Sequence, residues 1–201
     1  MKLIIITGPS GSGKTTLAKK LNKQLNNAYT LSTDNFYKTG IVSNILSKFI
    51  KSYFDKNFSM NNKLINKTVK EILNNKKIDY LYIYDFKKKK IKKVNKKSTP
   101  IDNLIIEGIF ALDLLKLFSS NDYLIINLNI KKNLCRERIF VRDQNERGKD
   151  RKTSLKNFQN AWRLYRLKDK FLKNIDKRKI IVFEKEPELK KIIDKLIKSN
   201  Y

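Results

Sequence analysis

The chain has 201 residues, enough for one α/β domain with a real core, and its net charge is +27. Its single cysteine excludes an intrachain disulfide, and the lack of histidine removes the commonest general base and metal ligand, so a catalytic base has to be a carboxylate or another group. Met1 stands almost at the first apolar run and no run is long enough to span a bilayer, so we expect a cytoplasmic protein without a membrane partner.

The positive charge comes mostly from lysine, in a chain that is also rich in asparagine and isoleucine. This residue usage is typical of an AT-rich coding sequence and favours charge spread over solvated surfaces. The densest run, Lys87 to Lys97, lacks the interleaved aromatic residues of a base-stacking platform. We therefore expect no specific nucleic-acid partner, although non-specific binding is expected at low salt.

Apolar runs that predict strands alternate with patterns of helical spacing, which indicates an α/β fold with a mainly parallel five-stranded sheet flanked by helices. The predicted strands are Leu3–Thr7, Tyr29–Ser32, Leu104–Glu107, Tyr123–Leu128 and Ile180–Phe183. The predicted helices are about Lys14–Asn26, Lys63–Asn74, Ala111–Phe118, Lys131–Arg142, Thr153–Leu172 and Glu188–Lys198. Tyr80–Tyr84 and Ile91–Val94 predict a small antiparallel β-hairpin, inserted at about residues 80–97 of a single domain that covers residues 1–201.

A phosphate-loop pattern, G-x-x-x-x-G-K-[ST], follows directly on the first strand. Its glycines let backbone N–H groups point inward and form an anion-binding nest at the start of a helix. Lys14 can reach the β- and γ-phosphates, and the Thr15 hydroxyl can bind Mg²⁺. We expect ATP to be held by Gly8, Ser10, Gly11, Ser12, Gly13, Lys14, Thr15 and Thr16.

Two carboxylates follow predicted strands at the same edge of the sheet. Asp34 comes just after the second strand, where a carboxylate near Mg²⁺ can orient an acceptor hydroxyl or take its proton. An Asp that caps a turn or helix fits this position equally well. Glu107 ends a buried apolar strand, as the acid of a Walker B segment does, and is a candidate Mg²⁺ ligand. The alternative is a Glu that only bonds a helix N-terminus.

Arginines recur at about one-turn spacing in a segment over about residues 136–153. Arg138 and Arg142 share a helix face, Arg147 follows past the predicted helix end, and Gly148 provides a flexible joint. Such a segment can form a lid whose arginines neutralise a transferring phosphoryl group and exclude water. A charged, solvated helix is the ordinary alternative.

Taken in order, G-P-S-G-S-G-K-T-T, L-S-T-D-N-F-Y-K, Y-D-F at Tyr84 to Phe86, I-I-E-G-I-F-A-L and R-D-Q-N-E-R-G-K-D resemble the uridine kinase (uridine-cytidine kinase) family of P-loop kinases. The resemblance implies a P-loop NTPase fold with a β-hairpin insertion and a helical lid. It implies ATP-dependent phosphorylation of the 5′-hydroxyl of uridine or cytidine, a step of pyrimidine salvage, with ATP and Mg²⁺ as cofactors. Relatives in the family assemble into dimers or tetramers, so a homo-oligomer is one possible state.

The resemblance also implies roles for individual residues. Asp34 corresponds to the general base, Lys14, Arg142 and Arg147 serve the phosphates, and Thr15, Glu107 and Asp34 serve Mg²⁺. The substrate-binding set is Tyr37, Asp55, Tyr84, Lys89 and Arg138. Asp55 corresponds to the ligand of the ribose hydroxyls, and Tyr37 and Tyr84 to contacts of the base.

The chain departs from the family pattern on the acceptor side. Lys89 stands where the family has a histidine near the pyrimidine, and a lysine can donate but cannot accept a hydrogen bond. Two alternatives therefore stay open: a kinase for another small alcohol, such as another nucleoside, a vitamin precursor or a sugar phosphate, or a nucleotide-binding protein associated with nucleic acid. A GTP-dependent switch is not expected, because no N-K-x-D motif is present.

Overall fold

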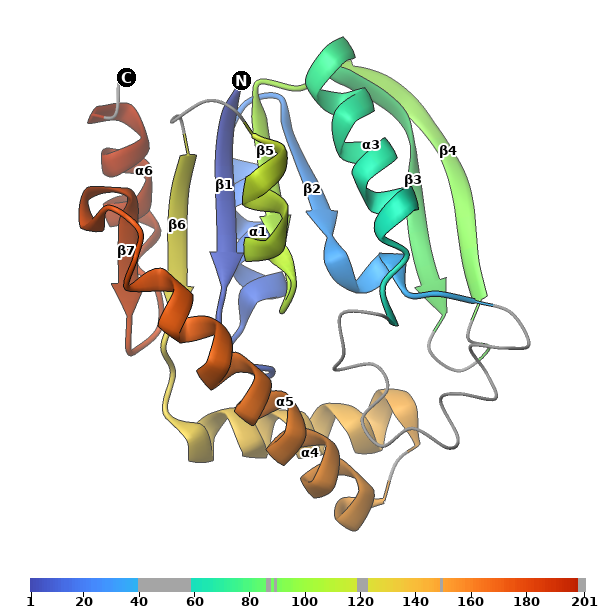
Figure 1. The fold of residues 1–201 in the computed structure, drawn as a ribbon, viewed down its shortest axis with the longest axis vertical. Helices are drawn as coiled ribbons and strands as arrows, with labels where there is room; N and C mark the ends of the chain where they lie inside the picture. Colours follow the sequence, from blue (N-terminus) through green and yellow to red (C-terminus); the bar gives the residue numbers. More distant parts are fainter. Residues whose placement is uncertain (40–58, 86–87, 89, 119–122, 149, 199–201) are drawn as a thin grey trace.

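A computed structural model describes residues 1–39, 59–85, 88, 90–118, 123–148 and 150–198 (Figure 1). Five parallel strands form the main sheet in the order β2-β5-β1-β6-β7. They are β1 (Lys2–Thr7), β2 (Ala28–Ser32), β5 (Asn103–Glu107), β6 (Tyr123–Leu128) and β7 (Ile180–Phe183). The five predicted strands and their parallel arrangement are confirmed.

The main sheet is buried on both faces because its central strands are apolar at nearly every position. Successive residues of a strand point to opposite faces, so Leu3 and Ile5 enter one core and Ile4 and Ile6 the other. The first core includes the buried face of α3 (Asn62–Asn75), and the second includes apolar residues of α1 (Lys14–Gln24), α5 (Arg151–Leu172) and α6 (Leu189–Lys198). None of the helices within the described ranges is both long and apolar enough to cross a membrane.

Two predicted helices differ from those observed. The segment Ala111–Leu117, expected as an α-helix, forms the 3₁₀ element η4. The helix α4 (Lys132–Arg147) continues well past Arg142, because no residue before Gly148 breaks it and Gly148 then ends it in a left-handed conformation (φ 60°). A further short 3₁₀ element, η5 (Lys177–Lys179), precedes β7.

The hairpin is longer than predicted and forms a separate two-stranded sheet. It consists of β3 (Lys77–Asp85) and β4 (Lys90–Pro100), paired from Lys77 with Pro100 to Asp85 with Lys90. The sequence predicts only the apolar centre of the hairpin. The hydrogen bonds between the two strands are made by backbone groups, so the pairing extends through the flanking lysines, whose side chains stay in water. Tyr80 and Tyr84 alternate with exposed residues of β3 and are buried in the first core.

The carboxyl ends of the sheet strands meet at one edge, above the α4 and α5 helices in Figure 1. The register places Ser32 of β2 and Ile6 of β1 opposite Glu107 of β5, and Asn127 of β6 opposite Thr7. The phosphate loop follows β1, and the 3₁₀ element η1 (Thr33–Phe36) follows β2. The sheet therefore brings the predicted phosphate loop, Asp34 and Glu107 to the same edge.

Candidate active site at the carboxyl edge of the sheet

The phosphate loop is fixed by close backbone contacts that exclude side chains. A Cβ atom on Gly8 would lie 2.7 Å from the Leu128 carbonyl oxygen, and one on Gly11 would lie 2.4 Å from the Cys135 carbonyl oxygen. Both glycines have positive φ, as does Gly13 (φ 95°), which begins α1. The loop thus lies between the N-terminus of α1 and the backbone that follows β6, with its amides available for phosphate oxygens.

Lys14 lies within the loop, with its side chain nearly buried. Its Nζ atom donates hydrogen bonds to the carbonyl oxygens of Gly8 at 3.1 Å and Pro9 at 2.9 Å. Burial lowers the pKa of Lys14, while the nearby carboxylates of Glu107 and Asp34 act in the opposite direction. The ammonium group is therefore held at the loop by two carbonyl groups, which phosphate oxygens can replace as stronger acceptors.

Glu107 is 2% exposed and lies against the first residues of α1. The Thr15 hydroxyl is 3.3 Å from both of its carboxylate oxygens. Burial raises the pKa of Glu107, the charge of Asp34 raises it further, and a hydrogen bond from the Ser32 side chain acts in the opposite direction. A cation bound between Glu107 and Asp34 would relieve this repulsion.

Asp34 is presented by η1, and the Gly108 backbone fixes its distance from Glu107. A Cβ atom on Gly108 would lie 1.9 Å from the Thr33 hydroxyl oxygen and 3.5 Å from Oδ1 of Asp34. This Oδ1 atom is buried and makes no hydrogen bond with the residues that the structure describes. Buried carboxylate oxygens normally have a partner, so an unpartnered one beside the phosphate loop indicates a position for a ligand group.

The oxygen donors of Thr15, Glu107 and Asp34 fit Mg²⁺. Among the described ranges, no three His, Cys, Asp or Glu residues are grouped closely enough to hold a metal ion by themselves. Mg²⁺ does not need such a group, because it usually keeps several waters and binds one or two carboxylates together with substrate phosphates. The site therefore suits a metal ion that enters with a triphosphate.

A pocket of about 230 Å³ opens on the outer side of the phosphate loop. It is lined by Ser12, Gly13, Thr16, Leu17, Lys20, Ile130, Arg138, Glu186 and Pro187. Lys20 and Glu186 form an ion pair of 3.4 Å at its rim. Its contact with Ser12 and Gly13 of the phosphate loop makes it a candidate site for part of a bound nucleotide.

Arg138 lies in this pocket. Its guanidinium Nη1 atom is 3.9 Å from the position of a Cβ atom on Gly13. The reason is the packing of α4, in which Cys135 and Ile139 both contact Gly11 and so place Arg138 alongside the phosphate loop. The sequence predicts Arg138 in the substrate-binding set, and the structure places it in the pocket beside the phosphate loop.

The expected acceptor residues that the structure describes, Tyr37 and Tyr84, are brought together. Their rings meet edge to face, with centroids 5.4 Å apart, and both are almost fully buried. The Tyr84 backbone N–H donates to the Asn35 side chain at 3.1 Å, which ties the hairpin to the turn that carries Asp34. Asp55 and Lys89 lie outside the described residues.

The lid arginines lie on α4, below the phosphate loop. Arg142 donates from Nε and Nη2 to Oδ1 of Asp143, at 3.3 and 3.0 Å, and Asp143 is itself buried. The positive charge of Arg142 also contributes to the lowered pKa of Lys14, so the two cations are close in space. Arg147 belongs to the last turn of α4, but its side chain lies outside the described part.

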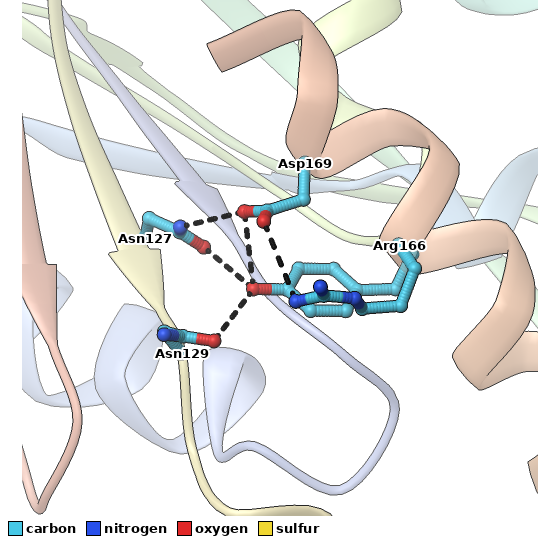
Figure 2. A network of polar contacts seen from close by, with 5 residues as sticks. Asn127, Asn129, Arg166 and Asp169 are labelled. Atoms are coloured by element: carbon cyan, nitrogen blue, oxygen red, sulfur yellow. Dashed lines mark hydrogen bonds and ion pairs between the residues drawn. The ribbon is translucent and has the colours of Figure 1, made fainter. Parts of the chain in front are cut away.

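Sequence reasoning missed a polar cluster at the end of β6. Asn127 and Asn129 from this strand end meet Tyr165, Arg166 and Asp169 of α5. Figure 2 shows Asn127 joined to Asp169, and both asparagines joined to the tyrosine hydroxyl. The one sequence signal is the spacing of Tyr165 and Asp169, which puts both on the same helix face.

Known proteins share parts of this sequence and its fold. A family model described as "Phosphoribulokinase / Uridine kinase family" matches residues 3–187. A uridine kinase of Borrelia turicatae is 36% identical over 109 residues, which are 54% of this chain and 52% of that protein. A uridine kinase of Schizosaccharomyces pombe is 33% identical over 153 residues, which are 75% of this chain and 33% of that protein. The matched region thus spans about half the length of the Borrelia protein.

Solved structures share the arrangement of helices and strands. The YFH7 protein of Saccharomyces cerevisiae, a P-loop-containing chain with a circular permutation, has a TM-score of 0.69 at 10% identity and aligns over 92% of this chain and 93% of that one. A Bacillus stearothermophilus protein described as a possible uridine kinase has a TM-score of 0.55 at 17% identity, over 91% and 88%. At these identities the likeness establishes the P-loop kinase fold alone.

The matched range includes the phosphate loop, Asp34, Glu107 and α4. With residues 3–187 matched, the chain belongs to the phosphoribulokinase/uridine kinase family.

Proposed function

We propose that this protein is an ATP-dependent phosphotransferase that phosphorylates the 5′-hydroxyl of a nucleoside, with uridine or cytidine as the acceptor, in pyrimidine salvage. The observation that carries the proposal is the buried Oδ1 atom of Asp34, which has no hydrogen-bond partner among the described residues and lies beside Glu107 and the phosphate loop. A simple nucleotide-binding protein has no use for a second carboxylate at this position.

The residues of the site divide between donor and acceptor. The loop amides from Gly8 to Thr15 and the Lys14 ammonium bind the donor phosphates, and Arg138 lines the pocket for the donor base. Asp34 orients the acceptor hydroxyl toward the γ-phosphate and takes its proton as the new P–O bond forms. Tyr37 and Tyr84 form a buried aromatic surface next to η1, which suits packing against a nucleobase.

Two further groups act on the charge of the reacting phosphates. Mg²⁺, when bound by Thr15, Glu107 and Asp34, neutralises charge on the triphosphate. Arg142, held by Asp143, supplies a second positive charge from α4, and closure of this helix would exclude water that otherwise hydrolyses ATP.

A second acceptor class, another small alcohol, is supported by Lys89, which stands in place of the histidine expected near a pyrimidine. A lysine offers only donors, so it suits an acceptor that carries phosphate oxygens at this position, such as a sugar phosphate. The donor chemistry is the same in both cases.

The test is a screen of purified protein with Mg·ATP against a panel of nucleosides and small alcohols, with products identified by mass. We expect uridine or cytidine monophosphate, and we expect Asp34→Asn to lower turnover by about 10²–10⁴-fold, the usual contribution of a general base, while ATP binding changes little. The matched control is Asp79→Asn, at an exposed position of β3, which should keep full turnover. ATP binding without transfer to any nucleoside would contradict the proposal.

A further inference from the structure

The polar cluster at the end of β6 is buried at its centre and open to solvent at Asp169 and Arg166. Tyr165 and Asn127 are each 4% exposed. The Tyr165 hydroxyl oxygen is 3.3 Å from Oδ1 of Asp169, 3.2 Å from Oδ1 of Asn129 and 3.5 Å from Oδ1 of Asn127. The Asn127 Nδ2 atom donates to the same Asp169 oxygen at 3.3 Å, as Figure 2 shows.

The Asp169 carboxylate organises these contacts. It is an acceptor only, so its Oδ1 atom takes hydrogen bonds from both the tyrosine hydroxyl and the asparagine amide, while Oδ2 faces Arg166 at 3.8 Å. Burial, and then the charge of Asp169, raise the pKa of Tyr165, so its hydroxyl keeps its proton and acts as a donor at neutral pH. Removing that hydroxyl would leave Oδ1 of Asp169 with the Asn127 amide as its remaining hydrogen-bond donor among these residues.

The segment that this cluster holds forms one wall of the phosphate loop. Asn127 stands opposite Thr7, the residue before Gly8, in the sheet register. The next residue, Leu128, places its carbonyl oxygen 2.7 Å from the position of a Cβ atom on Gly8. Two residues further on, Ile130 lines the nucleotide pocket. A shift of Asn127 would therefore move the backbone against which the phosphate loop is closed.

The cluster also joins α5 to the sheet. Helix α5 packs along α4, which carries Arg138 and Arg142, and both helices cross the carboxyl edge of the sheet in Figure 1. The contacts of Tyr165 and Asp169 with the strand end therefore set the position of the helix pair relative to the phosphate loop.

We propose that Tyr165, held by Asp169, is a positioning residue for the triphosphate donor, because it fixes the segment from Asn127 to Ile130 against which the phosphate loop and the nucleotide pocket are built. The inference rests on the proposed function insofar as it takes the donor to be Mg·ATP. Tyr165 itself is not among the residues that line the pocket. Its effect passes through the strand end, and it should change donor affinity more than the affinity for the acceptor.

The experiment compares Tyr165→Phe with Tyr29→Phe. The Tyr29 hydroxyl is also buried and donates one long hydrogen bond, 3.4 Å to the Tyr80 carbonyl oxygen, at the opposite side of the sheet from β6, so the chemical change is the same. Binding of the magnesium complex of a non-hydrolysable ATP analogue is measured by calorimetry, with thermal unfolding of each variant recorded alongside.

We expect Tyr165→Phe to weaken binding of the analogue by about three- to tenfold, the range that corresponds to the net free energy of one hydrogen bond, and Tyr29→Phe to change it by less than about twofold. Where activity is measurable, KM for ATP should rise and KM for the acceptor should stay constant. Asp169→Asn, which keeps the shape but not the charge, should weaken binding in the same direction, and it decides the matter if Tyr165→Phe does not fold.

Equal affinities of the Tyr165→Phe and Tyr29→Phe variants for the ATP analogue would overturn the inference. If Tyr165→Phe does not fold, unchanged binding of the analogue by Asp169→Asn would overturn it. A merely structural role of the hydroxyl would lower the unfolding temperature of both tyrosine variants without this difference in affinity. This binding experiment does not depend on the acceptor. If the wild type binds the analogue but phosphorylates no nucleoside, the proposed function is wrong. The inference about Tyr165 is then still tested by the binding data.

Discussion

Replacement of Gly108 by alanine tests the link between the end of β5 and the turn that carries Asp34. The added Cβ atom would lie 1.9 Å from the Thr33 hydroxyl oxygen and 3.1 Å from the Thr33 Cβ atom. Rotation of the Thr33 side chain relieves the first contact but not the second, and Thr33 is completely buried. The variant must also hold an alanine at φ +131°.

The magnitude follows from two separate costs. Positive φ costs an L-residue about 1–2 kcal/mol, and an extra carbon atom in a close-packed core costs about 1–3 kcal/mol, so we expect Gly108→Ala to lower the free energy of unfolding by about 2–5 kcal/mol. Gly148→Ala separates the backbone cost from the packing cost, because Gly148 also has positive φ (60°) but a Cβ atom there meets nothing within 4 Å. That variant should lose only about 1–2 kcal/mol.

The assay is urea unfolding of both variants, followed by phosphoryl transfer and binding of Mg·ATP at a temperature where both are folded. Relief of the clash moves η1 and with it Asp34, so Gly108→Ala should lose transfer more than it loses ATP binding. If Gly108→Ala unfolds no more readily than Gly148→Ala, the turn is not held by this contact, and the account of how Asp34 is positioned is wrong.

Three further predictions concern the loop, the hairpin and the lid. Lys14→Met removes a charged donor from the phosphate loop and should weaken Mg·ATP binding at least about tenfold, measured by calorimetry; unchanged affinity would contradict the role of Lys14. Asn35→Ala removes the side-chain oxygen that accepts the Tyr84 N–H, so it should lower the free energy of unfolding in urea by about 1–3 kcal/mol. The KM for the phosphate acceptor should rise, and the KM for ATP should stay unchanged. An unshifted unfolding midpoint would contradict this prediction. The pKa of Asp150 is lowered by hydrogen bonds from the hydroxyl and the backbone N–H of Thr153, so its folded pKa lies below its unfolded value of about 3.9. The stabilisation that Asp150 gives α5 is present above the unfolded pKa and is lost as pH falls through the folded pKa. The difference in unfolding temperature between wild type and Asp150→Ala should therefore be largest near neutral pH and vanish in acid. A difference independent of pH would contradict the role of Asp150.

The strands and the phosphate loop could be predicted because each is determined by a short stretch of sequence. The apolar run from Leu3 to Ile6 forms β1, and the glycines after it permit the positive φ angles that the loop requires. The end of α4 was predicted too early, because the polar residues after Arg142 resemble a helix end, although the first residue that stops the helix is Gly148. The 3₁₀ form of η4 depends on how its seven residues fit between β5 and the core, which no local pattern reports.

In the candidate site, too, the residues that follow from a short stretch of sequence could be predicted, and those that depend on packing could not. Asp34 and Glu107 could be predicted because each directly follows or ends a strand, and parallel strands bring their carboxyl ends together. The position of Arg138 could not, since it depends on which residues of α4 pack against Gly11. The cluster around Tyr165 could not be predicted either, because Asn127 and Tyr165 are 38 residues apart and neither belongs to a motif.

The two halves of the site differ in how they tolerate substitution. The donor half is made largely of backbone groups, and side chains at Gly8 and Gly11 are excluded by contacts of 2.7 and 2.4 Å, so its chemistry is tied to a few residues. The proposed acceptor half includes Tyr37 from the loop after β2 and Tyr84 from the hairpin, which is a sheet of its own. Because no strand of the hairpin pairs with the main sheet within the described residues, substitutions there can reshape the acceptor site without disturbing the phosphate loop. Acceptor selectivity should therefore change through the hairpin and the residues around Tyr37 while ATP binding stays constant.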